Sequence, residues 1–140
     1  MYQFTQSGDT YVVSINNHEE LVAALAQFCT DQGILAARID GIGAVSSATL
    51  RFLDPATKKY VDGTFDEQME IAALVGNVSQ KDGKVYMHLH ATFGRRDYTS
   101  IAGHLLCARI NGAGEVFVTR LFCTPGRRFD EETGLNLYQF

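Results

Sequence analysis

The 140-residue sequence predicts one α+β domain, with a largely antiparallel or mixed sheet of about seven strands and one or two helices. Short apolar or alternating runs recur along the chain and are separated by turn-forming residues, as in sheets joined by hairpins. Apolar residues at helical spacing occur in one stretch near the N-terminus. No linker or low-complexity tract divides the chain. We therefore expect a single domain over residues 1–140, with a core at about 10–122 and a C-terminal tail at 123–140.

The first two expected elements are a strand and a helix. Residues 11–15 form a β-type run, and residues 18–29 follow as an amphipathic helix. Asn17 is the expected N-cap, with Glu20 three residues later completing a capping-box pair, and Gly33 is placed to end the helix. The apolar face of this helix is formed by Leu21, Val22, Leu25 and Phe28.

Two glycines, Gly41 and Gly43, interrupt the apolar run at residues 34–45. Gly-x-Gly also occurs in dinucleotide-binding loops, but such a loop needs a third small residue and then a helix. Residues 46–52 are instead typical of a strand. The sequence therefore favours a strand with a bulge or a close backbone approach at the glycines, which leads into a hairpin at residues 47–61.

Three further segments complete the expected sheet. Residues 71–78 form a nearly continuous apolar run, which is typical of a buried central strand. An Asp-Gly pair at 82–83 is a strong hairpin signal and joins this run to a strand at 85–93. After a second turn at 111–114, residues 115–122 alternate between apolar and polar and predict another strand.

Three of the four histidines fall on two segments that are expected to pair. His88 and His90 are two residues apart on a strand, so their side chains share one face while the residues between them face the core. If the hairpin places Phe93 opposite Ile101, then His90 lies opposite His104 and all three histidines share that face. A register shift of one residue would bury His104, so burial favours this register.

These three histidines have two interpretations. Neutral imidazoles held on one side of a sheet can bind zinc or another divalent ion, and three protein ligands leave a position open for water. Alternatively, they are solvent-facing histidines that need no metal. Glu70, at the start of the apolar run, is the candidate for a fourth ligand or a general base, or else an ordinary carboxylate at a strand end.

Other chemistry has weaker support in the sequence. The basic pairs Arg95-Arg96 and Arg127-Arg128 each follow a glycine. Such arginines can hold a phosphate, but the sequence favours a solvated loop or a subunit salt bridge to Asp97, Asp130 or Glu131. No Ser-His-Asp spacing, phosphate-binding loop or helix-turn-helix pattern is present. None of the cysteines has a base partner nearby, which disfavours a cysteine nucleophile.

The composition limits the partners and the location. The net charge of -4 argues against a broad basic surface for nucleic acid, although it allows a local basic patch. The three cysteines are widely spaced and form no Cys-x-x-Cys pair, which is typical of thiols in a reducing compartment. The chain has neither a signal-peptide pattern nor an apolar run of membrane-spanning length. We therefore expect a cytoplasmic protein with no membrane partner.

Seven short motifs follow one another over most of residues 10–122. They are Asp-Gly-Ile-Gly-Ala-Val-Ser at 40–46, Phe-Leu-Asp-Pro with Lys-Lys-Tyr at 52–60, Glu-Ile at 70–71, Leu-Val-Gly-Asn-Val-Ser at 74–79, Asp-Gly-Lys at 82–84, His-Leu-His-Ala at 88–91 and Gly-His-Leu at 103–105. Together these motifs resemble the PPC (plants and prokaryotes conserved) domain in its free-standing prokaryotic form. Each motif alone is unspecific, and their order makes the resemblance specific.

The resemblance implies a compact α+β fold assembled as a homotrimer. In plants the domain follows AT-hook DNA-binding motifs and mediates assembly and partner contacts, and prokaryotic members commonly carry a DNA-binding label. This chain has no Arg-Gly-Arg-Pro hook, and only Glu70 and Ile71 match the plant partner-contact segment. His88, His90 and His104 match positions at which prokaryotic members look able to hold a metal.

Two functions are compatible with these expectations. One is a DNA-binding or regulatory module that carries a divalent metal, zinc by its ligand type. The other is a metal-dependent enzyme of lyase or hydrolase type acting on a small molecule. The enzyme alternative rests on a similarity of fold to acetolactate decarboxylase, which uses a three-histidine zinc site.

Overall fold

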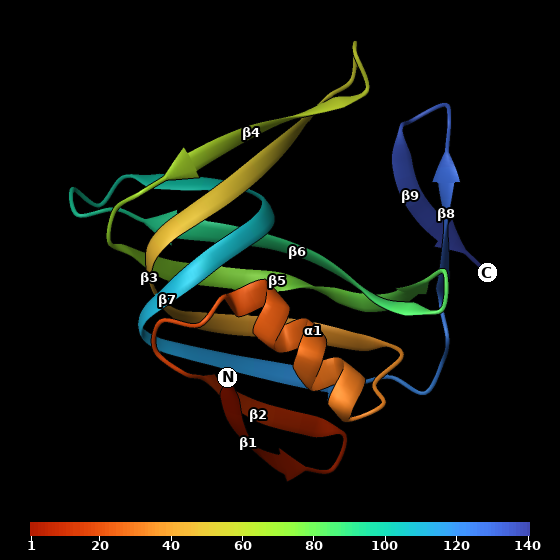
Figure 1. The fold of residues 1–140 in the computed structure, drawn as a ribbon, viewed down its shortest axis with the longest axis horizontal. Coiled ribbons are helices and arrows are strands. Elements are labelled where there is room, and N and C mark those ends of the chain that lie inside the picture. Colours follow the sequence, from red (N-terminus) through yellow and green to blue (C-terminus); the bar gives the residue numbers. More distant parts are fainter.

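The computed structural model describes all 140 residues as one small domain with nine strands and a single helix (Figure 1). The expected seven strands are an undercount, because residues 2–7 and the tail also form strands, and no second helix is present. The elements are β1 (Tyr2–Ser7), β2 (Thr10–Ile15), α1 (Leu21–Asp31), β3 (Ala37–Asp54), β4 (Lys59–Phe65), β5 (Met69–Lys81), β6 (Lys84–Gly94), β7 (Ser100–Arg120), β8 (Gly126–Asp130) and β9 (Leu135–Gln139).

The sheet closes on itself. Its main order is β1-β2-β7-β3-β5-β8-β9, with β4 added to β3 and β6 paired to both β5 and β7. Consequently β3 pairs with β5, β5 with β6, β6 with the first part of β7, and β7 with β3 again. The 21-residue β7 makes this possible by curving across the molecule (Figure 1). A single parallel pairing, between Gln80 and Gly126, makes the otherwise antiparallel sheet mixed.

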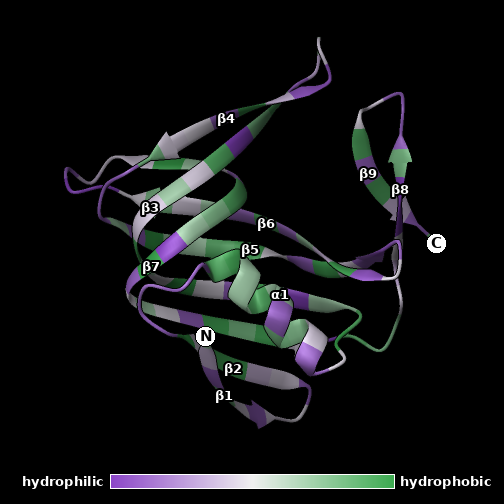
Figure 2. Ribbon diagram, in the orientation of Figure 1, coloured by the Kyte–Doolittle hydropathy of each residue, from purple (hydrophilic) through white to green (hydrophobic).

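One face of the curved sheet and α1 enclose a hydrophobic core of 26 buried residues. Side chains of a strand alternate between its two faces, so β2 buries Tyr11, Val13 and Ile15 and exposes the residues between them. Figure 2 shows the hydrophobic residues gathered in α1 and the strands behind it, while the tips of the hairpins are hydrophilic. The helix contributes Leu21, Ala24, Leu25, Phe28 and Cys29 to the core.

The helix begins three residues later than expected, and the prediction of Asn17 as its N-cap is wrong. Glu20 is the N-cap, and its carboxylate accepts hydrogen bonds from the backbone N–H groups of Val22 (2.9 Å) and Ala23 (2.7 Å). The same carboxylate accepts a third hydrogen bond, at 3.0 Å, from the backbone N–H of Ala108 in β7. This tertiary bond selects Glu20 over Asn17. With 11 residues, α1 is too short to span a membrane. The structure contains no helix that is long and apolar enough to do so.

The glycines lie where the sequence indicates a special backbone. Gly33 follows the end of α1 with φ of +59°, in the left-handed region that favours glycine. The pairing of β3 shifts register between Gly41 and Gly43, which confirms the predicted bulge. A Cβ atom on Gly43 would lie 2.3 Å from the carbonyl oxygen of Ala113, so the two backbones approach too closely for any side chain.

The C-terminal tail, expected at residues 123–140, forms the paired hairpin β8–β9. In Figure 1 this hairpin and the β3–β4 hairpin both project from the body of the sheet and rise in the same direction. They meet near their tips, where the Lys58 ammonium group donates a hydrogen bond of 2.8 Å to the carbonyl oxygen of Glu131. The two hairpins are thus joined at their tips, beyond the body of the sheet.

Candidate metal centre

The three histidines lie together on the face of the sheet that points away from α1. In β6, Leu89 is buried in the core, whereas its neighbours His88 and His90 point outward and are half-buried and exposed. His90 pairs with His104 of β7 in the register that the sequence predicts. The strands therefore hold all three imidazoles on one side of a rigid ladder.

The imidazole rings surround a common point. Their centroids are 5.3 Å apart for His88 and His90, 5.1 Å for His88 and His104, and 5.5 Å for His90 and His104. One ligand nitrogen from each ring lies within 4.8 Å of the others. Tetrahedral zinc sets such nitrogens about 3.3 Å apart, so small side-chain rotations bring the three into a coordination geometry. The residues present fit a divalent metal.

The surroundings favour the neutral form of these imidazoles. Desolvation by burial, followed by the neighbouring His88 and His90, lowers the pKa of His104 to about 4. Desolvation also lowers the pKa of His88, with further contributions from the positive charge of Arg127 and from His90. Because metals bind the deprotonated nitrogen, both side chains are in the ligand form at neutral pH.

The β3–β4 hairpin forms one border of the cluster. The ring of Tyr60 lies 5.8 Å from that of His104, measured between centroids. The Arg51 guanidinium lies 4.8 Å from the centre of the Tyr60 ring and forms a two-pronged ion pair with Asp62, at 2.7 and 3.0 Å. Since Asp62 neutralises Arg51, this border carries little net charge.

The β8–β9 hairpin forms the other border and brings Arg127 beside the cluster. Arg127 donates a hydrogen bond of 2.9 Å to the side chain of Asn77, the residue paired with His88 across the strands. The sequence marks Arg127 only as one of a basic pair, and it does not connect Tyr60 with the histidines. No local pattern links segments so far apart along the chain, so neither neighbour could be found from it.

Glu70 lies outside the group of potential ligand atoms, which contains only the three histidines. It pairs with Gly94 at the end of β6, four residues from His90, or about 13 Å along a strand. There it borders a surface hollow together with Glu67 and Arg95, which form an ion pair. Arg95 thus forms an ion pair within the chain, with a partner that the sequence analysis does not predict.

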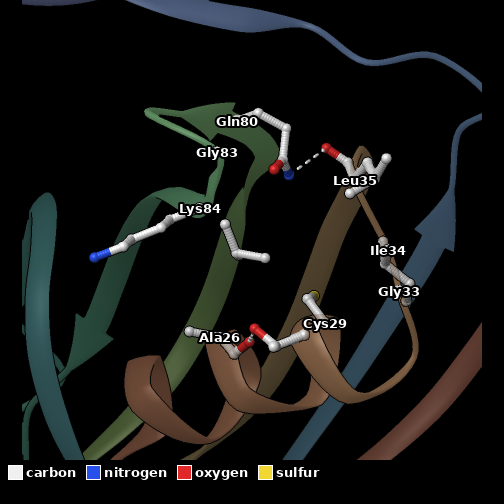
Figure 3. A pocket seen from close by; sticks show the side chains of 10 residues that line it. Ala26, Cys29, Gly33, Ile34, Leu35, Gln80, Gly83 and Lys84 are labelled. Atoms are coloured by element: carbon white, nitrogen blue, oxygen red, sulfur yellow. Dashed lines mark hydrogen bonds between the residues drawn. The ribbon is translucent and has the colours of Figure 1, made fainter.

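A separate hollow of about 380 Å³ lies on the helix side, between the C-terminal end of α1 and the β5–β6 turn (Figure 3). The Gln80 side chain crosses it and donates a hydrogen bond to the carbonyl oxygen of Leu35. Cys29 lies in its wall, where burial raises the pKa of the thiol to about 12. A thiol with this pKa stays protonated and is a poor nucleophile, so this hollow offers no reactive cysteine.

Comparison with known families decides the relationship of the chain. The family model of the Plants and Prokaryotes Conserved (PCC) domain matches residues 2–122. The chain belongs to this family. The resemblance seen in its short motifs is therefore confirmed. No curated protein matches this PCC-domain chain.

Solved structures repeat the PCC fold closely. A "putative dna binding protein" from Bacteroides thetaiotaomicron is 51% identical, has a TM-score of 0.98, and matches over 100% of this chain and 98% of that one. A metal-containing protein from Archaeoglobus fulgidus is 38% identical, with a TM-score of 0.90, over 100% and 99% of the two chains. A Staphylococcus aureus protein similar to alpha-acetolactate decarboxylase shares the fold alone, at 12% identity and a TM-score of 0.56, over 87% of this chain and 56% of that one.

Proposed function

We propose that this PCC-domain protein binds a divalent metal ion through His88, His90 and His104 and acts as a regulatory binding module. The main support is the placement of three ligand nitrogens within 4.8 Å of one another on paired strands. Because the strands hold the side chains in one register, little conformational freedom is lost on binding the ion. The Archaeoglobus relative, 38% identical, is described as a metal-containing protein.

Zinc is the metal that we propose. Neutral imidazoles are good zinc ligands, and sites with three protein ligands keep the fourth position open for water or another ligand. When bound, zinc polarises an oxygen atom or lowers the pKa of its water. The chain contributes the fixed ring positions and the two hairpins that border them.

Metal analysis of the purified protein tests this proposal. We expect about one metal ion per chain in the wild type and a large loss in His90→Ala. His18→Asn is the matched control, because His18 is exposed, lies outside the cluster and has φ of +67°, which asparagine tolerates. It should retain the metal. Equal metal content in His90→Ala and the wild type would exclude the site.

We also propose that the module is a homotrimer, because the face that carries the histidines has apolar side chains in water. Cross-strand pairing places Val12, Phe117, Asp40, Val75 and His90 in one row across this face. The three apolar members of the row are 40–49% exposed. Contacts between copies would remove this surface from water.

Light scattering coupled to gel filtration tests the assembly. We expect a mass of three chains for the wild type and a smaller mass for Phe117→Lys, which places a charge in the apolar row. Phe140→Lys is the control, since Phe140 is fully exposed at the C-terminus. A monomeric wild type would contradict the proposal.

DNA is the partner that we propose to test first, because the Bacteroides relative, 51% identical, is named a "putative dna binding protein". With a net charge of -4, this chain would bind DNA only through a local basic region. Titration of a DNA duplex with the protein at several salt concentrations measures this binding. The affinity should fall linearly with salt on logarithmic axes, and no salt-dependent binding near about 150 mM would exclude DNA.

A metal-dependent enzyme acting on a small molecule is the second candidate. The observation that favours it is the setting of the histidines, which have Tyr60 on one side and Arg127 on the other. A metal there would have protein groups beside its open position, as lyases and hydrolases require. Turnover by the metal-loaded wild type that His90→Ala lacks would establish an enzyme.

A further inference from the structure

We infer that the face carrying the histidines binds a small organic carboxylate, coordinated by the metal at one end and held by the Arg127 guanidinium at the other. This inference rests on the proposed metal site and names the class of ligand that fits beside it. Three observations on Arg127 carry it: its position on the histidine face, its fixed orientation, and the lack of a carboxylate partner.

Arg127 reaches over the same face of the sheet as the histidines. On β6, Tyr86 and His88 share that face, and their cross-strand partners on β5 are Ser79 and Asn77. Arg127 donates from Nε to the Ser79 hydroxyl at 2.7 Å and from Nη2 to the Asn77 carbonyl at 2.9 Å. Directly paired residues have Cβ atoms about 4.5–5.5 Å apart, so the guanidinium contacts the immediate neighbour of His88.

The guanidinium is also held in one plane. It lies between two tyrosine rings, 4.1 Å from the centre of Tyr138 and 5.0 Å from that of Tyr86. Nη1 donates to the carbonyl oxygen of Asn136 at 2.8 Å. The bonds to Ser79, Asn77 and Asn136 use three of the five N–H groups of Arg127. One N–H group therefore stays free on each terminal nitrogen. A planar guanidinium with free N–H groups on both terminal nitrogens suits the two oxygens of a carboxylate.

No acidic residue neutralises Arg127. Its partners are a hydroxyl, an amide and a carbonyl, and it takes part in none of the ion pairs within 4.0 Å. Arg51, on the other side of the histidines, is neutralised by Asp62. A divalent ion on three neutral imidazoles would therefore add its charge to that of Arg127. An anion between the two offsets this excess of positive charge.

The groups beside the histidines favour a small ligand over a polymer such as DNA. The β3–β4 hairpin brings Tyr60 beside His104, and the β8–β9 hairpin brings Arg127 beside Asn77, which pairs with His88. A small carboxylate needs only the metal and Arg127, whereas a duplex needs an extended basic surface, which the net charge of -4 disfavours.

Calorimetric titration of the zinc-loaded protein with malonate tests the inference. Malonate should bind the wild type and should bind Arg127→Gln about 10- to 100-fold more weakly, because a charge-assisted hydrogen bond is lost. Arg128→Gln is the matched control, since it removes the same charge from an exposed position one residue further along β8, and it should bind like the wild type. The neutral analogue malonamide should show no binding.

Metal content, measured first in every variant, separates the two proposals. Zinc uptake without malonate binding, or equal affinity in the wild type and Arg127→Gln, would overturn the carboxylate inference and leave the metal site standing. Absence of zinc from the wild type would overturn both. Arg127→Lys checks for damage to the hairpin, because it keeps the charge. Tighter malonate binding by Arg127→Lys than by Arg127→Gln supports the inference, and equal binding by the two overturns it.

Discussion

Replacing Gly76 with alanine tests how tightly β5 and β6 are packed beneath the histidines. A Cβ atom at this position would lie 2.1 Å from the carbonyl oxygen of His88 and 2.9 Å from the Cα atom of Leu89. Ordinary van der Waals contact begins at 3.4 Å, so the oxygen would have to move about 1.3 Å (3.4 minus 2.1). Both contacts are with backbone atoms, which cannot rotate away as a flexible side chain can.

The expected cost follows from this displacement. Overpacking a core typically costs about 1–3 kcal/mol, and we expect the upper end, about 3 kcal/mol, because the backbone itself must shift. For a chain of this size the melting temperature should fall by about 10 °C. Zinc affinity should fall too, since metal sites tolerate ligand displacements of only about 0.2 Å and the shift is centred on His88.

Thermal unfolding followed by circular dichroism measures the first effect, and zinc titration measures the second. Gly63→Ala is the control, because its Cβ atom would meet only the ring of Phe65, at 3.5 Å. It should melt within about 2 °C of the wild type. The reasoning fails if Gly76→Ala melts as Gly63→Ala does and keeps its zinc, because β5 and β6 would then lie farther apart.

Three other perturbations have outcomes set by the same geometry. Between about pH 6.5 and 4 the metal-free protein should lose up to about 3 kcal/mol more stability than His104→Asn, because the unfolded chain protonates His104 at its ordinary pKa while folding lowers that pKa to about 4. Urea titrations at each pH measure the free energy of unfolding of both proteins. The prediction fails if the free energy of the metal-free protein and that of His104→Asn change equally with pH. Glu20→Ala should cost about 2 kcal/mol in the same assay. Glu19→Ala should cost less than about 0.5 kcal/mol, because the Glu19 carboxylate has only a long contact of 3.9 Å with the N-terminal ammonium group. Iodoacetamide should modify exposed Cys123 in the native protein and spare Cys29, as read by mass spectrometry.

The pairing of the histidines could be predicted because its determinants are local. The alternation along β6 and the short polar loop after it set the register of the β6–β7 hairpin, and a slip would bury His104. The bulge at Gly41 and Gly43 was predictable for a similar reason, since the two glycines and the strand pattern after them occur together in the sequence.

The remaining features depend on contacts between distant segments. The start of α1 is decided by the bond from Ala108 in β7 to Glu20, which no helix-capping pattern contains. Tyr60 and Arg127 reach the histidines from hairpins whose orientation is a property of the folded sheet. Strand β1, mostly exposed and mixed in polarity, has little apolar pattern and gains its place through antiparallel pairing with β2.

During synthesis of the chain, the two ends of β7 differ in how far away along the sequence their pairing partners lie. Its last residues close the fold, because Arg120 pairs with Ala37 and Thr119 with Thr10, and such distant pairings form slowly. Its first residues pair with the adjacent β6, so residues 88–104 can form a local hairpin as soon as they leave the ribosome. A growing chain therefore presents all three histidines before the last residues of β7, which complete the sheet, have been made. Zinc captured at that stage would stabilise the hairpin, and the supply of metal would then influence how efficiently the protein folds.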